Sequence, residues 1–297
     1  MQLMELSREL SGVVEAVGRS VVRVERGGRP VSGSVVSSEG HVVAISHTVD
    51  RDEEVELGLP DGRGVRARVL GRDPGTDLAL LQAEATGLQP APFAGLEGVG
   101  VGALALGVYR PGRTTRATLG IVAALGDSWR TRYGGRVDRY LEASLPLAPG
   151  FSGGLLADAS GRALGVSSSG LLRGVALGIP AATVTRVVDS LREHGRVKRG
   201  FLGIASQPVA LPEPLQASLG QPAGLLVMRV VPGSAAQAAG VLLGDVVVSV
   251  DGHSVASPVD LLSALDEERV GQRSRLRLLR GGEALELELT IGEREGR

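Results

Sequence analysis

The chain has 297 residues, 43% of them hydrophobic, and a formal net charge of -1, so it can bury a sizeable core and is not disordered by composition. It lacks the positive charge of a nucleic-acid binder, and the absence of cysteine excludes disulfides, thiolate zinc sites and a cysteine nucleophile. The histidines lie far apart, and neither a metal site nor a cofactor is expected; they are His41, His47, His194 and His253.

The N-terminal segment predicts a single helix. Apolar residues from Leu3 to Val17 recur at spacings of three and four, which is typical of one helical face over residues 3–18. The segment carries charges early and has no long apolar run, so neither a signal peptide nor a membrane span is predicted. We therefore expect a chain that works in the cytoplasm or has lost a leader.

From Val21 onward the apolar period changes to two. Runs such as V-V-R-V-E-R, H-V-V-A-I-S and D-L-A-L-L predict strands, and Ser-Glu-Gly, Pro-Asp-Gly and Asp-Pro-Gly predict the turns between them. Closely spaced turns of this kind are typical of a β-barrel or sandwich. Further strands are predicted at 101–108, 116–125, 137–143, 154–157, 162–168 and 174–179.

A predicted helix closes this first domain. Residues 181–195 carry an apolar stripe at helical spacing and end at Gly195, the expected C-cap, with His194 in the last turn. The first domain is thus predicted to span residues 1–194, followed by a basic linker at 195–200.

A second domain is predicted at residues 201–293. Its helices are expected at 234–240 and at 257–268, where Ser257 is the N-cap. Its strands are expected at 201–206, 224–231, 245–250, 274–280 and 284–291.

Ser152 lies in the stretch A-P-G-F-S-G-G-L-L at residues 148–156, which fits three interpretations. G-F-S-G-G matches the G-x-S-x-G nucleophile elbow of α/β-hydrolases, but that elbow needs a following helix, and here a strand follows. The serine could be a small residue in a tight bend. It could also be a trypsin-like nucleophile, which requires His, then Asp, then Ser on an all-β scaffold.

The chain order favours the trypsin-like interpretation. His47 follows the strand H-V-V-A-I-S, Asp77 opens D-L-A-L-L-Q, and Ser152 comes later. Each residue could instead have a purely structural role. His47 could be a core histidine, and Asp77 could cap a turn, as is expected of Asp73. His41 is expected to be exposed and inert.

Several blocks resemble the HtrA/DegP family of serine proteases. A-I-S-H-T-V, D-P-G-T-D-L-A-L-L-Q and P-G-F-S-G-G-L-L are similar to its catalytic blocks, and R-G-F-L-G-I and V-P-G-S-A-A-Q-A-A-G-V-L-L-G-D to its PDZ domain. The resemblance implies a mostly β chain, with a chymotrypsin-like double β-barrel followed by a PDZ domain, a small β-barrel with two helices. It implies an ATP-independent endopeptidase for unfolded or damaged proteins, active in bacterial quality control and stress response.

The resemblance also implies residue roles. His47 would take the proton of Ser152 and pass it to the leaving amine, Asp77 would orient the imidazole, and the N–H groups of Gly150 and Ser152 would form the oxyanion hole. Leu147 would line a pocket for a small or medium apolar side chain before the scissile bond. The strand expected to pair with the substrate backbone holds Ser167, Ser168 and Ser169.

In the PDZ domain, four residues either offer backbone N–H groups to a peptide C-terminal carboxylate or form a buried strand: Phe201, Leu202, Gly203 and Ile204. The family further implies unfolded-protein and peptide partners, a periplasmic or cell-envelope location and, by analogy, a homotrimer. No nucleic acid partner is expected.

The sequence departs from the family pattern around the predicted oxyanion hole. Phe151 replaces the usual Asn before the serine, and other differences lie at 108–111, at Ala143–Ser144 and at Leu155. These changes support an alternative hypothesis, a catalytically silent peptide-binding scaffold. The intact His–Asp–Ser order favours the protease.

Overall fold

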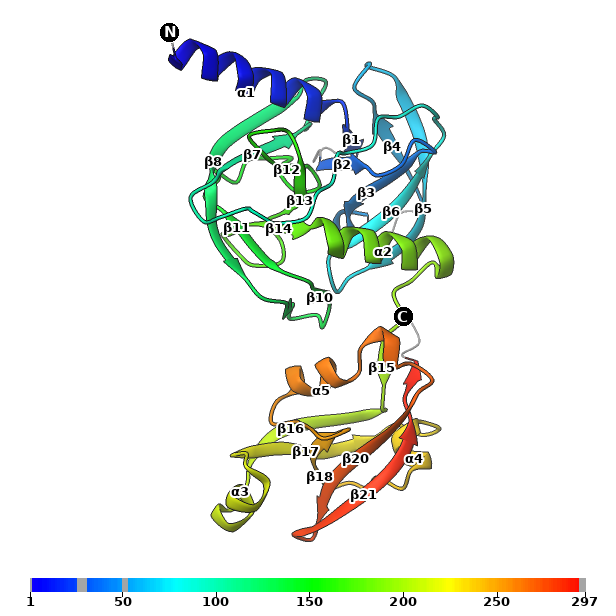
Figure 1. Ribbon diagram of the computed structural model, residues 1–297. Helices are drawn as coiled ribbons and strands as arrows, with labels where there is room; N and C mark the ends of the chain where they lie inside the picture. Colours follow the sequence, from blue (N-terminus) through cyan, green and yellow to red (C-terminus); the bar gives the residue numbers. More distant parts are fainter. Residues whose placement is uncertain (1, 26–30, 50–52, 294–297) are drawn as a thin grey trace. The chain divides into compact units, whose positions relative to one another are not determined.

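The computed structural model describes residues 2–25, 31–49 and 53–293. The chain divides into two compact units, Met1–Val197 and Lys198–Arg297 (Figure 1). The mostly β architecture predicted from the sequence is confirmed, because the first unit holds two closed barrels and the second an antiparallel sheet with short helices.

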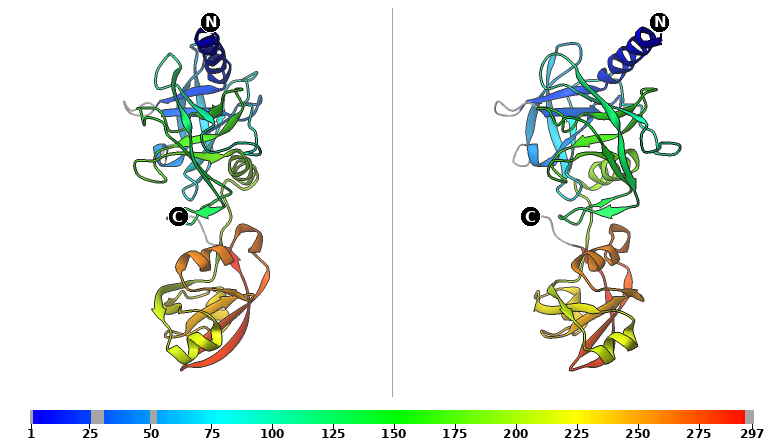
Figure 2. Two further views of the ribbon diagram at one scale, coloured as in Figure 1. Left: turned by 60° about the vertical axis from the view of Figure 1, so that its left-hand side comes forward. Right: turned by 90° about the vertical axis from the view of Figure 1, so that its left-hand side faces the viewer.

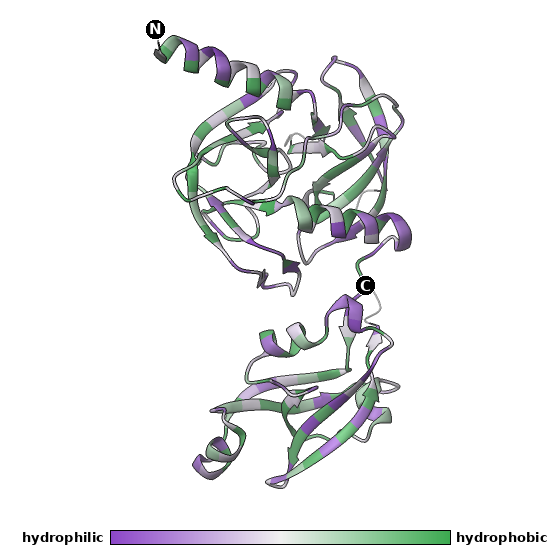
Figure 3. Cartoon of the chain, in the orientation of Figure 1, coloured by the Kyte–Doolittle hydropathy of each residue, from purple (hydrophilic) through white to green (hydrophobic). Residues whose placement is uncertain are grey.

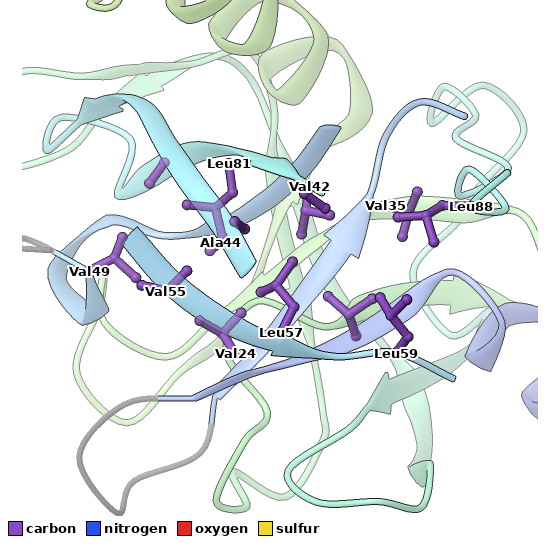
Figure 4. Close-up of a cluster of buried hydrophobic side chains, with 14 residues drawn as sticks. Val24, Val35, Val42, Ala44, Val49, Val55, Leu57, Leu59, Leu81 and Leu88 are labelled. Atoms are coloured by element: carbon purple, nitrogen blue, oxygen red, sulfur yellow. The ribbon is translucent and has the colours of Figure 1, made fainter. Parts of the chain in front are cut away.

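The first barrel is an antiparallel sheet closed in the order β1-β2-β3-β6-β5-β4. Its interior is filled by small and branched apolar side chains, among them Val24, Val42, Leu57 and Leu81 (Figure 4). Its strands are β1 (Val21–Glu25), β2 (Val31–Val35), β3 (His41–Ile45), β4 (Glu54–Gly58), β5 (Gly64–Asp73) and β6 (Leu78–Ala83). The 3₁₀ turn η1 (Ser46–Thr48) follows β3 directly.

The second barrel closes in the order β11-β14-β13-β12-β7-β8. Its strands are β7 (Leu104–Tyr109), β8 (Arg116–Gly126), β11 (Tyr140–Ala143), β12 (Leu155–Asp158), β13 (Ala163–Ser168) and β14 (Ala176–Pro180). A small hairpin of β9 (Trp129–Arg130) and β10 (Arg136–Val137), which the sequence pattern did not predict, packs Trp129 edge-on against Tyr140 with ring centroids 5.9 Å apart.

Two helices accompany the barrels. Helix α2 (Ala181–His194) ends as predicted at Gly195, whose φ is 69°, and its apolar side joins a core cluster that contains residues of both barrels. Helix α1 (Gln2–Gly18) packs against the rest of the first unit through Val13, Val14 and Val17, and the N-terminal end of the helix projects away from that unit (Figures 1 and 2).

The second unit is a sheet in the order β16-β17-β18-β20-β21, with β19 beside β18 and a separate pair β15–β22. Apolar and polar residues alternate along β20 and β21 (Figure 3), so one face of each strand supplies the core. The strands are β15 (Gly200–Phe201), β16 (Ile204–Ala210), β17 (Ala223–Val230), β18 (Val246–Val250), β19 (His253–Ser254), β20 (Arg273–Arg280), β21 (Glu283–Thr290) and β22 (Gly292–Glu293).

The helices of this unit are shorter than the sequence pattern predicted, and one was missed. The segment predicted as helix 257–268 is α5 (Pro258–Ala264) followed by the 3₁₀ turn η2 (Glu267–Arg269), with the expected Ser257 cap completed as a capping box by Asp260. Helix α4 (Ala235–Ala238) lies within the predicted 234–240, whereas α3 (Glu213–Leu219) was not predicted.

Candidate active site

His47 and Asp77 lie together because β3 and β6 are antiparallel neighbours in which Ile45 faces Leu78. Asp77 directly precedes β6, and His47 lies in η1 just after β3. The His47 N–H donates to Asp77 Oδ1 at 3.1 Å, which fixes the backbone of one residue against the side chain of the other. The strand register therefore brings the two residues together, and this hydrogen bond holds them.

The Asp77 carboxylate orients the His47 imidazole. Both carboxylate oxygens lie within hydrogen-bond distance of His47 Nδ1, at 2.9 and 2.8 Å. The Asp77 side chain is 9% exposed and that of His47 is 58% exposed. A buried acceptor of this kind keeps the proton on Nδ1 and leaves the outward Nε2 as the base.

The turn before β6 holds Asp77 in an uncommon conformation. Its φ is 62°, in the left-handed region that aspartate tolerates better than most residues. Asp73 caps this turn as predicted: it accepts the N–H of Gly75 and of Thr76, each at 3.1 Å, and the Thr76 hydroxyl at 2.6 Å.

The loop that carries Ser152 bends sharply at Gly150. Its φ is 83°, and a Cβ there would lie 2.5 Å from the Cβ of Pro111, so only glycine fits without movement. Three amide N–H groups of the loop donate to protein carbonyls over 2.8–3.2 Å: those of Phe151, Gly153 and Gly154.

The amides of Gly150 and Ser152 differ from these three. In the part of the chain that the structure describes, neither N–H donates to a protein acceptor. Two unpaired N–H groups that flank one residue can both serve a single oxygen, and these are the two predicted for the oxyanion hole.

The segment after β13 touches both halves of the site. The Ser152 Oγ lies 2.9 Å from the Oγ of Ser169 and accepts the Ser169 N–H at 3.1 Å. A Cβ on the next residue, Gly170, would lie 3.0 Å from His47 Cε1 and 3.1 Å from Asp77 Oδ2. Ser152 and the His47–Asp77 pair therefore border adjacent residues of one segment.

The predicted substrate-binding residues differ in exposure. Leu147 is 41% exposed, and its place in a substrate pocket stays a prediction. Ser167 and Ser168 are buried, and the Ser167 hydroxyl donates to the carbonyl of Phe151, so it supports the nucleophile loop. Pairing of this strand with a substrate backbone stays a prediction.

Phe151 does not lie over the site. Its side chain is 2% exposed and packs edge-on against Tyr109 in the core of the second barrel, with ring centroids 6.2 Å apart at 65°. The substitution therefore fills the barrel interior, and its position gives no support to the silent-scaffold hypothesis.

In the second unit, the predicted strand 201–206 is interrupted. Phe201 ends β15, Ile204 begins β16, and between them Leu202 is buried while Gly203 has a φ of 85°. A Cβ at Gly203 would lie 2.1 Å from that of Ser234, so the bend leaves no room for a side chain there. Within the described residues, the N–H groups of Leu202 and Gly203 donate to no protein acceptor.

Three residues around the nucleophile loop were not singled out from the sequence: Ser32, Ser34 and Arg110. Each is buried and bonded to the loop or its surroundings. The two serines alternate in V-S-G-S-V and therefore face one side of β2. This alternation of polar residues is the feature by which the sequence could have indicated them. Burial lowers the pKa of the Arg110 guanidinium.

Two further sequence expectations concern histidine and metals. His41 is not exposed as expected: it is buried, and its Nδ1 lies 2.7 Å from Ser37 Oγ. Across the described ranges, no group of three or more His, Cys, Asp or Glu side chains is placed to hold a metal ion. None of the described helices is long and apolar enough to cross a membrane.

Comparison with known proteins defines the class of this chain. Residues 31–166 match the family model of the trypsin-like peptidase domain, and residues 200–291 match that of the PDZ domain. The chain is thus a trypsin-like peptidase unit followed by a PDZ unit.

Its relatives narrow this class. The chain is 31% identical over 267 residues to a probable periplasmic serine endoprotease DegP-like from Pseudomonas putida (strain W619), covering 88% of this chain and 55% of the relative. It is 32% identical over 266 residues to the protein of that name from Chlamydia trachomatis serovar D (strain ATCC VR-885 / DSM 19411 / UW-3/Cx), covering 88% and 53%. The chain spans about half the length of these curated relatives.

Solved protease structures are similar to this chain over nearly its whole length. The HtrA-type protease AlgW with decapeptide has a TM-score of 0.79 at 25% identity, covering 97% of this chain and 99% of that chain. The serine endoprotease from Yersinia pestis has a TM-score of 0.76 at 26% identity, covering 96% and 98%. Over both of its units the chain is similar to DegP-like and HtrA-type proteases.

Proposed function

We propose that the chain is an ATP-independent serine endopeptidase that cleaves unfolded or damaged proteins, with a PDZ domain that binds peptide C-termini to regulate cleavage. One observation carries this proposal: a His47 imidazole oriented by a buried carboxylate borders the same segment as Ser152, whose own N–H and that of Gly150 have no protein acceptor in the described residues. Each part has a defined task in acyl transfer.

The residues act in sequence on a bound peptide bond. Nε2 of His47 accepts the Ser152 hydroxyl proton as Oγ attacks the scissile carbonyl carbon, and the negative charge develops on the carbonyl oxygen. The N–H groups of Gly150 and Ser152 stabilise that oxygen, while Asp77 stabilises the imidazolium. The imidazolium then protonates the leaving amine, and water hydrolyses the acyl-enzyme with His47 again as base.

The PDZ role rests on the bend at Leu202 and Gly203. Their two unpaired N–H groups lie at the start of β16, where a peptide carboxylate can accept both. The solved relative AlgW was determined with peptides, and the curated relatives are named periplasmic. We extend both properties to this chain, placing it in the bacterial periplasm. No G-x-x-x-x-G-K-[ST] nucleotide motif occurs in the sequence, consistent with ATP independence.

The first test is labelling with a fluorophosphonate probe, wild type beside Ser152→Ala, with degradation of unfolded casein in parallel. We expect wild type to label and to degrade casein, and Ser152→Ala to do neither. A folded wild type that fails to label, with or without a C-terminal peptide, would support a peptide-binding scaffold instead. Proteolysis that persists in Ser152→Ala would refute the nucleophile assignment.

The second test concerns regulation. Deleting residues 200–297 should leave Ser152 reactive toward the probe but change the processing of long substrates. The matched control is Gly203→Ala in the full chain, which disturbs the proposed carboxylate loop without removing the domain. If the truncated chain cleaves every substrate as the full chain does, the regulatory role fails.

A further inference from the structure

Ser32 on β2 of the first barrel makes three hydrogen bonds to the second half of the peptidase unit. It is fully buried. Its hydroxyl donates to the carbonyl of Gly150 at 2.6 Å and accepts the N–H of Arg110 at 2.8 Å. Its own N–H donates to the carbonyl of Ser152 at 3.1 Å. Ser32 therefore binds the two residues whose N–H groups are proposed to form the oxyanion hole, and no others in that loop.

These bonds restrict the direction of the hole donors. The N–H groups of Gly150 and Ser152 lie in the peptide planes that precede these residues, and Ser32 holds the carbonyls of the planes that follow them. In each case the N–H is joined to the held plane through the φ and ψ of one residue. Rotation of either residue would have to break a buried hydrogen bond. The two donors thus stay preorganised without a substrate.

Arg110 keeps the Ser32 hydroxyl in one orientation. Its backbone N–H occupies the Ser32 Oγ as an acceptor, so the single hydroxyl proton is directed to Gly150. The Arg110 guanidinium is in turn fixed by the carbonyls of Gly18 and Val21, at 3.0 and 2.7 Å, and by the Thr115 hydroxyl at 2.7 Å. The chain of bonds from the end of α1 to the hole is therefore continuous.

Ser34 offers an internal comparison. It is also fully buried and lies two residues further along β2, and its hydroxyl donates to the carbonyl of Gly153 at 2.9 Å. The Gly153 N–H is already donated to Ser167 and takes no part in the hole. The two serines thus share strand, burial and bond type but differ in the residue they hold.

We propose that Ser32 is a positioning residue of the oxyanion hole, fixing the Gly150 and Ser152 N–H groups from the opposite barrel. This inference rests on the proposed endopeptidase function. It goes beyond the His–Asp–Ser constellation because the partners of Ser32 are backbone groups of the loop and of Arg110, rather than the imidazole or the nucleophile hydroxyl.

The experiment compares Ser32→Ala with Ser34→Ala in the full chain, using a fluorogenic peptide. We expect Ser32→Ala to lower kcat by about 10- to 100-fold with KM unchanged, since removal of a whole oxyanion donor costs about 10²- to 10³-fold. Ser34→Ala should keep kcat close to wild type. The pH midpoint of kcat/KM should not move in either variant, because His47 and Asp77 are untouched.

A second readout separates positioning from general weakening. An alkyl boronic acid forms a tetrahedral adduct on the serine whose oxygen occupies the hole, so Ser32→Ala should weaken its binding in proportion to the loss of kcat. Ser32→Cys keeps the volume and a weak donor and should give intermediate values. The thermal unfolding midpoint reports whether Ser32→Ala folds. If that variant does not fold, Ser32→Cys replaces it in the comparison with Ser34→Ala.

The outcomes are distinct. Equal kcat in Ser32→Ala and Ser34→Ala, or a loss confined to KM, would overturn the positioning role while leaving the peptidase intact. Absence of turnover in wild type, with Ser152→Ala indistinguishable from it, would instead show that the proposed function itself fails.

Discussion

The two barrels of the peptidase unit hold their parts of the site by different means. The first barrel joins His47 to Asp77 through the register of two neighbouring strands, and their bonds are local to that barrel. The second barrel presents Ser152 on a loop whose carbonyls are held by serines of the first barrel and of β13.

This difference separates the proposed base from the loop of the proposed nucleophile. The base depends on one buried carboxylate and one short turn, whereas the loop is held by bonds from the other barrel. Changes at His47 or Asp77 should alter proton transfer and its pH dependence, and changes at Gly150 or Ser32 should alter the stabilisation of the oxyanion. The following predictions test that separation, from the largest effect to the smallest.

Asp77→Asn should give the largest loss, about 10⁴-fold in kcat. The amide can present an N–H to His47 Nδ1, which stabilises the wrong tautomer and removes the base at Nε2. The measurement is the kcat of peptide hydrolysis as a function of pH. Asp61→Asn, in an exposed turn of the same barrel, is the control and should be neutral. A loss below about tenfold would contradict the role given to the carboxylate.

Gly150→Ala should lower kcat by about 10²- to 10³-fold, as expected for loss of an oxyanion donor. The added Cβ would lie 2.5 Å from Pro111 at a φ of 83°, so the loop must shift. The pH midpoint should stay that of wild type, because the His47–Asp77 pair is unaffected.

Gly174→Ala is the matched control for Gly150→Ala. Its φ is 79°, so the backbone strain is similar, but nothing lies within 4 Å of its added Cβ. Gly174→Ala should lose the stability that backbone strain alone costs, Gly150→Ala should lose more because of the added clash, and only Gly150→Ala should lose turnover. Similar kcat values for the two would mean that backbone strain, and not the hole, sets the rate.

Ser169→Ala should raise the rate of fluorophosphonate labelling of Ser152 by about two- to tenfold, the equivalent of one net hydrogen bond. The Ser169 hydroxyl lies 2.9 Å from Ser152 Oγ, close enough to accept the Ser152 proton, and we expect it to compete with His47 Nε2 for that proton. Ser168→Ala is the control, since that buried hydroxyl accepts the N–H of Gly170. A slower reaction in Ser169→Ala would show that this hydroxyl assists attack.

The smallest effect concerns Tyr140 and reports on the second barrel alone. Burial, the hydrogen bond to Glu142 Oε2 and the charge of Glu142 raise the pKa of Tyr140 to about 12 from an ordinary 10.0. Stabilisation by this phenol is therefore complete below pH 10.0 and lost as the pH rises through about 12.

The measurement is tyrosinate absorbance against pH, wild type minus Tyr140→Phe. Residues 21–83 of the first barrel contain no tyrosine, so the signal arises from the second half of the unit. A difference spectrum that titrates at about 12 confirms the prediction, and one that titrates at 10.0 contradicts it.

The sequence by itself determined a mostly β first domain typical of a β-barrel or sandwich, the order His47, Asp77, Ser152 and the glycine at position 150. These follow from local information: alternating apolar residues, turn motifs and a left-handed backbone position that only glycine fills. The two barrels were expected only from the resemblance to the HtrA/DegP family. The C-cap at Gly195 and the turn cap at Asp73 were predictable for the same reason.

Only the tertiary structure decided what surrounds these residues. Phe151 looked like a disturbance next to the nucleophile, but its direction depends on the interior of the second barrel, where it meets Tyr109. Ser32 lies 118 residues from Gly150 in the chain, so no local pattern could connect them. Hydrogen bonds between segments so distant exist only once both barrels have closed, because the fold alone brings donor and acceptor to bonding distance.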